Sequence, residues 1–404
     1  MLFDQDLYLR GAKMMTYFTL SFVIGIWLAP ATISLLNKLK FWKKVSRTAD
    51  VTGKEFEVTK QFYEEEKVTK TPRAGGILIW GTTLIIATLF FVALKIFAPT
   101  PDSALGEFLN FIDVRQTFIP LGVLVLGALL GLVDDYLAVT PTGGSYFAGG
   151  LKLSHRMIGV LGISFLVGLW FHLKIGDVMH KITTPIPTGD AGQPWYVIRL
   201  DAIQLPFGWF DRAVHSVLGW DFSLASGGWL IIPITMIVLT FLWGSAIIDG
   251  YDGLAAGSLI PVFLAFAGLA FVSEYFQTAT LMMVITGAMV AYLWYNIPPA
   301  KFYMGDTGST PLLLVLGTVA MLIDKLFIVP IIAVVFMATV MSAILQVFWK
   351  KVFKRKLFLA APIHHHFEAL GWLRHQVTMR FWLVSTVASV IGFALGLIIT
   401  NRIY

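Results

Sequence analysis

The stretch Thr117-Phe-Ile-Pro-Leu-Gly-Val-Leu-Val-Leu-Gly-Ala-Leu-Leu-Gly-Leu-Val-Asp-Asp135 decides the fold of this chain. No residue before its two closing carboxylates is charged. A membrane-spanning helix needs about 20 predominantly apolar residues, so this stretch predicts most of one span. Ionisable side chains are costly in lipid and are usually functional there, which makes Asp134 and Asp135 candidates for a functional site.

The same apolar character extends over the whole chain. Of its 404 residues, 57% are hydrophobic and only 13% are charged, whereas a soluble domain carries about 25% charged residues. We therefore predict an all-α polytopic membrane protein whose residues 1–404 form a single integral membrane domain. The chain has no cysteine, which excludes disulfides, cysteine-ligated zinc, iron–sulfur clusters and thiol catalysis.

About ten transmembrane helices are predicted from the hydrophobic runs, each close to the length that a bilayer requires. Only Asp324-Lys325 interrupts the apolar run 309–348, and we interpret this pair as a tight turn between two helices. The ten spans are expected at about 14–36, 74–97, 117–139, 156–174, 228–248, 254–273, 276–297, 309–324, 325–348 and 380–400.

The net charge of +6 is concentrated in a few loops, a distribution that indicates membrane topology and argues against a nucleic-acid partner. Lys and Arg gather in 37–73 and 349–379, whereas 98–116 is acidic. The positive-inside rule then puts both termini outside the cytoplasm, together with a long loop at about 175–227. The cytoplasmic loops are predicted at about 37–73, 140–155, 249–253, 298–308 and 349–379.

Four polar motifs fall at the cytoplasmic ends of these spans. They are Asp134-Asp135, Asp249-Gly-Tyr-Asp252, Met304-Gly-Asp306 and His364-His365-His366. The predicted extracytoplasmic loops carry no comparable cluster. Because all four motifs lie on the same side of the membrane, they predict one active site on the cytoplasmic face.

The carboxylate motifs differ in what they can bind. Asp134 and Asp135 diverge by about 100° on a helix, so one can hold a metal or a basic group while the other faces a substrate. The alternative is a helix end reaching water, although carboxylates suit a helix C-terminus poorly. Asp249 and Asp252, with Gly250 and Tyr251 between them, suit the hydroxyl and imide donors of a nucleotide. A plain Asp-Gly turn is the alternative there.

The segment Met304-Gly-Asp306-Thr-Gly-Ser309 precedes a predicted helix. Asp306 or Ser309 can simply cap that helix. A helix N-terminus also binds anions, and a carboxylate there can hold Mg²⁺ against a bound pyrophosphate. Three contiguous histidines do not converge on one zinc ion as a helical i,i+4 pair does. His364, His365 and His366 are better suited to phosphate oxygens, and a polar surface loop is the alternative.

Four further polar residues lie near the same face. Asn296 ends the seventh span, where it either contacts the ligand or caps the helix before Pro298. Lys70, Lys152 and Arg73 can neutralise phosphate charge, although each alone also satisfies the positive-inside rule. Oxygen ligands with basic and histidine partners predict Mg²⁺-assisted phosphate chemistry. A membrane site open to the cytoplasm predicts phosphoryl transfer between a nucleotide-activated donor and a lipid phosphate.

Several segments, in order along the chain, resemble the phospho-N-acetylmuramoyl-pentapeptide transferase family. They are Thr71-Pro72 with Gly75-Gly76, Val133-Asp-Asp-Tyr136, Asp249-Gly-Tyr-Asp-Gly-Leu254, Met304-Gly-Asp-Thr-Gly-Ser309, Ala361-Pro-Ile-His-His-His-Phe-Glu368, Gly371-Trp372 and Arg380-Phe-Trp382. The triple histidine separates this family from the other polyprenyl-phosphate N-acetylhexosamine-1-phosphate transferases. This chain departs from the family at Ala246, where an asparagine is usual.

The resemblance implies transfer of phospho-MurNAc-pentapeptide from UDP-MurNAc-pentapeptide to undecaprenyl phosphate, giving lipid I and UMP. It implies Mg²⁺, ten helices, a homodimer and the bacterial inner membrane. Asp306 would bind Mg²⁺, and Asp134 and Asp135 would serve the lipid phosphate, one as base. The uridine would lie on 249–252 and Tyr303, and the histidines would contact the donor's phosphates or sugar.

Two other functions compete with this one. A GlcNAc-1-phosphate transferase would use the same acidic motifs with another UDP-sugar. An ion-coupled transporter or lipid flippase would need carboxylates near mid-membrane and on both access routes. The one-sided motifs favour the transferase.

Overall fold

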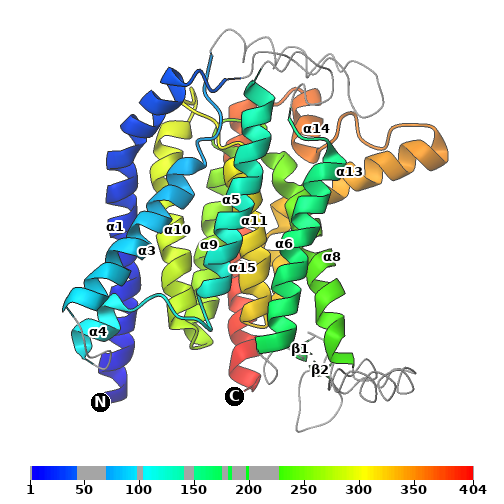
Figure 1. Ribbon diagram of the computed structural model, residues 1–404. Helices are drawn as coiled ribbons and strands as arrows, with labels where there is room; N and C mark the ends of the chain where they lie inside the picture. The colour runs from blue at the N-terminus through cyan, green and yellow to red at the C-terminus, as the bar shows by residue number, and fades with distance from the viewer. Residues whose placement is uncertain are drawn as a thin grey trace, which may run out of the picture.

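Helices make up nearly all the regular structure of the computed structural model, which describes residues 2–42, 70–97, 103–140, 150–174, 181–183, 197–199 and 227–403. Within those ranges, nine helices are long and apolar enough to cross a membrane. They form a bundle with both chain termini at one end and the short helix α14 (Ile363–Ala369) at the other (Figure 1). The predicted fold class, an all-α membrane bundle, is confirmed.

The helix bounds follow the predicted spans closely. The remaining α-helices are α1 (Leu2–Lys38), α3 (Ile77–Phe97), α4 (Ala104–Leu109), α5 (Phe118–Val139), α6 (Leu153–Lys174), α8 (Ile231–Gly244), α9 (Leu254–Val272), α10 (Phe276–Asn296), α11 (Asp306–Leu322), α12 (Val329–Ile332), α13 (Val334–Phe353) and α15 (Arg374–Ile403). Short 3-10 turns are η1 (Gly227–Leu230), η2 (Ser245–Ile248) and η3 (Leu326–Ile328). Helices α1 and α15 begin earlier than predicted because polar turns continue each helix beyond its apolar segment.

One short antiparallel pair departs from the all-α prediction within the described ranges. Strand β1 (Lys181–Thr183) pairs with β2 (Val197–Arg199), with Ile182 opposite Ile198. Both strands belong to the long loop predicted at 175–227, most of which lies outside the described residues. The same holds for most of the predicted loops 37–73 and 140–155.

The predicted turn at Asp324-Lys325 is confirmed. Helix α11 ends at Leu322, Asp324 adopts a φ of 53°, and the Lys325 N–H donates to the Ala320 carbonyl at 2.8 Å. The helix predicted at 325–348 is instead divided into η3, α12 and α13. Pro330 explains the break, because proline fits the first turn of a helix but not its interior.

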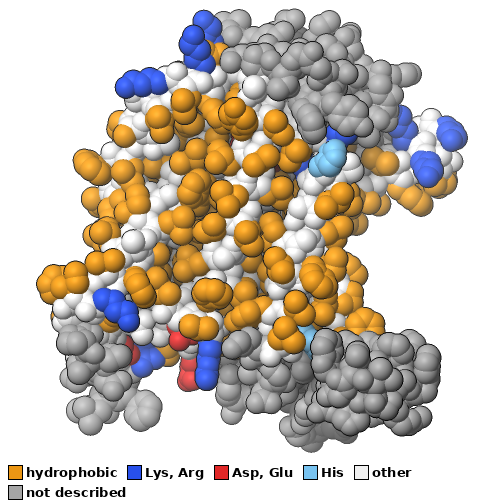
Figure 2. Space-filling model, in the orientation of Figure 1, with side chains coloured by type: hydrophobic (Ala, Val, Ile, Leu, Met, Phe, Trp, Pro, Cys, Tyr) orange, Lys and Arg blue, Asp and Glu red, His pale blue; other side chains and the backbone are white. Residues whose placement is uncertain are grey.

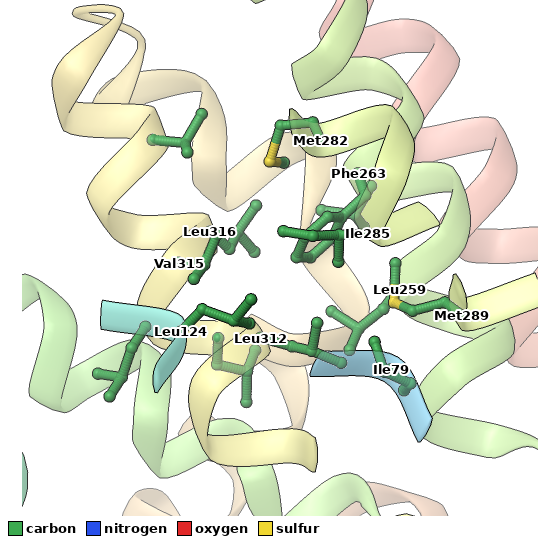
Figure 3. Close-up of a cluster of buried hydrophobic side chains, with 14 of the residues drawn as sticks. Ile79, Leu124, Leu259, Phe263, Met282, Ile285, Met289, Leu312, Val315 and Leu316 are labelled. Atoms are coloured by element: carbon green, nitrogen blue, oxygen red, sulfur yellow. The ribbon is translucent and has the colours of Figure 1, made fainter. Parts of the chain in front are cut away.

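Helix α11 forms the centre of the bundle. Every residue from Thr307 to Leu322 is buried. Leu312, Val315 and Leu316 lie in a cluster with side chains from the surrounding helices, including Leu124 of α5 and Ile285 of α10 (Figure 3). At 17 residues this helix spans about 25 Å, less than the roughly 30 Å of a bilayer core. It is the counterpart of the predicted span 309–324.

The outer surface has the distribution expected of a protein in lipid. A broad band of hydrophobic side chains covers the middle of the face in Figure 2, with Lys and Arg side chains toward its upper and lower edges. Exposed side chains such as Trp27, Leu129 and Ile237 contribute to the apolar surface. Because lipid tails are as apolar as these side chains, close packing holds the helices together more than the hydrophobic effect does.

Glycines let α5 and α11 approach closely. A Cβ at Gly131 would lie 2.0 Å from the Asp306 carbonyl oxygen, which is backbone and cannot rotate away. We therefore expect Gly131→Ala to lower the free energy of unfolding by about 1–3 kcal/mol, the usual cost of overpacking. Thermal unfolding in detergent would measure it.

Gly122→Ala is the matched control, because it lies on the same helix with nothing within 4 Å of an added Cβ. Alanine favours a helix over glycine by about 1 kcal/mol, so this variant should keep or raise the stability. Equal destabilisation by both substitutions would contradict the close approach of α5 and α11.

Candidate active site

Three carboxylates from two helices meet at the end of the bundle opposite the termini. Asp134 and Asp135 lie in the last turns of α5, and Asp306 is the first residue of α11. One ligand oxygen from each lies within 4.8 Å of the others. Asp134 and Asp135 are buried, whereas the Asp306 side chain is 25% exposed. The most accessible carboxylate is thus the one predicted to hold a metal.

The turn before α11 positions this cluster. Gly305 adopts a φ of 70°, and a Cβ there would lie 2.3 Å from Asp135 Oδ2. Only glycine satisfies both the left-handed backbone and the space. The backbone N–H of Thr307, in the first turn of α11, donates to Asp135 Oδ2 at 3.0 Å. Asp135 therefore bonds the first turn of α11, where exposed amides favour a negative charge.

Arg156, near the start of α6, lies between two of the carboxylates. Its Nη1 is 2.7 Å from Asp306 Oδ2 and its Nε is 3.2 Å from Asp134 Oδ1. The Leu151 N–H also donates to Asp134 Oδ1, at 2.6 Å. Asp134 and Asp135 thus have different partners, as expected of adjacent residues on a helix.

Arg156 is not among the site residues predicted from the sequence. A signal was present, because Lys152, His155 and Arg156 form a basic run at the start of the fourth span. Lys152 was selected from that run, and the structure leaves it exposed at the helix start. The residue one turn further along the helix is the one that reaches the carboxylates.

The cluster suits a divalent cation. The carboxylates of Asp134, Asp135, Asp249 and Asp306 outnumber the nearby guanidiniums of Arg156 and Arg73, and the donor atoms of the cluster are all hard oxygens. Mg²⁺ usually takes one or two carboxylates and completes its shell with water and substrate phosphate. These residues can hold a metal ion of that class, with Asp306 the most accessible ligand.

The loop 249–253 is bonded to the turn before α11. The Gly305 N–H donates to Asp249 Oδ2 at 2.9 Å, which joins this carboxylate to the residue preceding Asp306. Burial raises the pKa of Asp249 to about 7, and the Arg73 guanidinium acts against that increase. Asp249 therefore belongs to the same electrostatic site as the three clustered carboxylates.

Asp252 and Asn296 join the same loop to the segment 297–305. Asp252 Oδ2 accepts from the Ala300 N–H at 3.0 Å. Asn296 accepts from the Gly253 N–H at 2.9 Å and donates to the Phe302 carbonyl at 2.8 Å. Asn296 is buried with both ends of its amide bonded inside the protein, so the geometry supports a role in holding the two loops.

Residues 72–76 complete this side of the site. The Tyr303 N–H donates to the Pro72 carbonyl at 2.8 Å, and the Gly75 N–H donates to the Tyr303 carbonyl at 2.7 Å. Tyr303 is thus fixed between the glycine motif and Asp306. Lys70 is exposed just outside this pairing.

The three histidines lie on α14 and point to different partners. His365 Nδ1 bonds the Tyr251 hydroxyl at 2.8 Å, and His366 Nδ1 accepts from the Leu359 N–H at 3.2 Å. His364 is fully buried, and neither of its ring nitrogens has a hydrogen-bond partner among the described residues. Burial lowers the pKa of His364 well below its usual value, so the ring is neutral. The expectation that the histidines do not converge on one metal agrees with this geometry.

Tyr251 connects the histidines to the loop 249–253. Its hydroxyl also donates to Glu368, which accepts from Arg374 Nε at 2.9 Å. The hydrogen bond with His365, together with those from Tyr251 and Arg374, holds the pKa of Glu368 at about 2 despite its partial burial. Glu368 and Arg374 were not selected from the sequence, although the i,i+3 spacing of His365 and Glu368 indicates contact on a helix.

The predicted residues therefore form two connected groups. Asp134, Asp135, Asp306 and Asp249 meet around Gly305, and Tyr251 links the adjacent loop to His364 and His365. Lys70 and Lys152 lie exposed outside them. A negatively charged centre next to neutral and basic groups can bind a metal–phosphate unit.

Comparison with known proteins finds a family match over the centre of the chain. Residues 117–324 match the glycosyl transferase family 4 model. A phospho-N-acetylmuramoyl-pentapeptide transferase of Chloroflexus aurantiacus is 31% identical over 337 residues, covering 81% of this chain and 77% of that protein. Proteins of the same description from Shouchella clausii and Listeria welshimeri are each 29% identical. They cover 94% and 93% of this chain, and 97% and 95% of their own lengths.

Proposed function

This chain belongs to glycosyl transferase family 4 and, within it, to the phospho-N-acetylmuramoyl-pentapeptide transferases, and on that premise we propose how its site performs the transfer. The enzyme transfers phospho-MurNAc-pentapeptide from UDP-MurNAc-pentapeptide to undecaprenyl phosphate in peptidoglycan synthesis. An oxygen of the lipid phosphate bonds to the sugar-linked phosphorus of the donor. The diphosphate bond to that phosphorus breaks, and UMP leaves with the bridging oxygen.

The carboxylate cluster is the observation that carries the mechanism. Two phosphates must approach each other, and their mutual repulsion has to be offset by positive charge. Asp306, with Asp134 and Asp135 nearby, would hold Mg²⁺, which when bound supplies that charge. Arg156 contributes a permanent positive charge at the same place. One of Asp134 and Asp135 accepts a proton from the lipid phosphate.

The donor's nucleoside and sugar occupy the adjoining loops in this proposal. Asp249, Asp252 and Tyr303 hold the uridine, and Lys70 and Lys152 approach its phosphates from the exposed edge. His365, oriented by Tyr251 and Glu368, contacts the donor's phosphates or sugar. His364 lies beside the backbone of Gly250, and its ring nitrogens, which have no partner in the described part of the chain, can bond a ligand or a water molecule there.

Membrane orientation follows from the loop charges. We place α11 in the membrane as the eighth of ten spans, both termini outside, and the active site on the cytoplasmic face of the bacterial inner membrane, where a UDP-linked donor is available. A homodimer is the assembly that the family resemblance implies. Carboxylates gathered at one end also disfavour the transporter alternative.

Donor choice tests the proposed reaction. The purified chain with undecaprenyl phosphate, Mg²⁺ and UDP-MurNAc-pentapeptide should release UMP and form a lipid-linked muramoyl product. UDP-GlcNAc in place of the muramoyl donor should release none. Turnover of UDP-GlcNAc alone would favour the GlcNAc-1-phosphate transferase.

Single cysteines test the orientation, because the natural chain has none. Lys354 follows α13 near the site, whereas Glu274 lies in the turn between α9 and α10 at the opposite end, and both are exposed. In intact cells, an impermeant maleimide should label Glu274→Cys and leave Lys354→Cys unmodified until the membrane is opened. The reverse pattern would overturn the placement.

A further inference from the structure

A cavity lies between α1 and the end of α10, and none of the active-site carboxylates lines it. Its volume is about 500 Å³. On the α1 side, apolar Pro30 and Ile33 give way to Asn37 and Lys38 toward the helix end. These positions repeat every three or four residues, so they share one face of the helix. The cavity therefore has an apolar part toward the middle of the span and a polar part at its end.

Two lysines line the polar part from different elements. Lys38 ends α1, and Lys301 belongs to the loop between α10 and α11. Lys301 Nζ lies 5.6 Å from the centre of the Tyr295 ring, which also lines the cavity. Neither lysine forms an ion pair with any residue that the structure describes, and both are exposed. Within the described part of the chain, both charges therefore face the open cavity.

The surroundings indicate that this anion is attached to lipid. Trp27 lies on the same face of α1, one turn from Pro30 toward the middle of the span, and is 78% exposed. Trp294, next to Tyr295, is 67% exposed. Tryptophan and tyrosine are enriched where membrane-spanning helices meet the headgroup region, which fits Trp294 and Tyr295 at the end of α10, whereas Trp27 lies at the depth of the acyl chains. Figure 2 shows Lys and Arg side chains near the upper end of α1, above the hydrophobic band.

We propose that this cavity binds the headgroup of an anionic phospholipid, with Lys38 and Lys301 on its phosphate and the acyl chains along Trp27 and the apolar face of α1. Basic pockets between helices at a membrane surface commonly bind such headgroups. The cavity is open and polar at the ends of the helices, which is the depth at which the phosphate of a phospholipid lies in a bilayer. The proposal does not depend on the reaction that the enzyme catalyses.

The cavity is connected to the active site by one short loop. The Lys301 N–H donates to the Tyr295 carbonyl at 2.9 Å, which fixes this lysine against the end of α10. The two residues next to Lys301 form hydrogen bonds with active-site residues. The Ala300 N–H bonds Asp252, and the Phe302 carbonyl accepts from Asn296. A lipid held by Lys301 therefore stabilises the loop that also positions Asp252.

Lipid titration of the purified, delipidated full chain, followed by native mass spectrometry, tests the site. We expect one phosphatidylglycerol to bind at least tenfold more tightly than phosphatidylcholine with the same acyl chains. The double variant Lys38→Gln/Lys301→Gln should bind phosphatidylglycerol about 30-fold more weakly, the loss expected for two lysine–phosphate contacts at a membrane surface. Lys38→Arg/Lys301→Arg should retain binding.

Lys350→Gln/Lys351→Gln is the matched control, because it removes two exposed lysines from the end of α13. It should bind phosphatidylglycerol like the wild type. A thermal unfolding temperature equal to that of the wild type, measured without phosphatidylglycerol, would show that the Lys38→Gln/Lys301→Gln variant is folded. In hydrogen exchange, phosphatidylglycerol should protect residues 295–303 in the wild type alone.

Three results would overturn the proposal. The first is equal phosphatidylglycerol binding by the wild type and the Lys38→Gln/Lys301→Gln variant. The second is equal binding of phosphatidylcholine by the wild type. The third is displacement of the lipid by inorganic phosphate or glycerol 3-phosphate at the same concentration, which would indicate a site for a soluble phosphate.

Discussion

Replacing Asp306 by asparagine is expected to slow UMP release about a thousandfold or more, which corresponds to about 4 kcal/mol of lost transition-state stabilisation. The substitution keeps the shape of the side chain and removes the charge of the most accessible carboxylate in the cluster. Folding should change little, because Arg156 keeps Asp134 as an ion-pair partner when the charge of Asp306 is removed, and the backbone of α11 does not rely on the Asp306 carboxylate. Turnover and thermal unfolding of the same preparation would separate the two effects.

Asp324→Asn is the matched control for that experiment. It removes the same charge just beyond the other end of α11, at a φ of 53° that asparagine tolerates well. Its turnover should match that of the wild type. Near-normal turnover of Asp306→Asn would remove Asp306 from the metal role and with it the proposed use of the cluster.

Replacing Arg156 by glutamine should leave Asp134 and Asp306 without the counter-ion that they share. In the presence of EDTA we expect the free energy of unfolding to fall by an amount on the order of 3 kcal/mol, because removing one partner of a largely buried ion pair leaves its charge uncompensated. Added Mg²⁺ should restore much of that loss by neutralising the same carboxylates. Turnover at saturating Mg²⁺ should still fall about a hundredfold, and Arg156→Lys should recover part of it.

The cation dependence distinguishes this explanation from a general packing defect. Arg115→Gln removes an exposed arginine at the other end of the bundle and should alter neither stability nor its response to Mg²⁺. If the loss in Arg156→Gln were the same with EDTA and with Mg²⁺, the carboxylates and Arg156 would not share one electrostatic site.

Much of the fold could be predicted from the sequence because apolar length alone identifies a span. The turn at Asp324-Lys325 was also predictable, since two charged residues cannot remain in the middle of an apolar run at low cost. The break between η3 and α12 depends on Pro330, which lies in the first turn of α12. The central position of α11 was not predictable, because it depends on how closely Gly131 lets two helices approach.

For the site, the carboxylates could be predicted from the sequence, but the basic residue that contacts them could not. Span ends and loop charges indicated that Asp134, Asp135, Asp249 and Asp306 share one face, and their oxygens do lie around Gly305. Which basic residue reaches them could not be deduced, because the direction of a side chain depends on helix rotation. Lys152 and Arg156 are equivalent in charge, and only the packed α6 shows that Arg156 points inward.

The orientation of the three histidines likewise could not be deduced from the sequence. Three adjacent histidines give no indication of which is buried, because that depends on how α14 packs against Tyr251. His364 faces the protein interior, and His365 joins Glu368 in a network that holds Tyr251. Asn296 likewise resembled a ligand contact in the sequence, whereas the structure reveals the two loops that its amide connects.

Manganese binding is the most direct test of the central claim, that the three carboxylates of α5 and α11 form the cation centre of the transferase. Mn²⁺ can replace Mg²⁺ at oxygen ligands and is observed by electron paramagnetic resonance. In the presence of UMP, the wild-type chain should bind one Mn²⁺ tightly, and Asp306→Asn should bind it at least a hundredfold more weakly. Equal Mn²⁺ affinity in the two proteins would contradict the account.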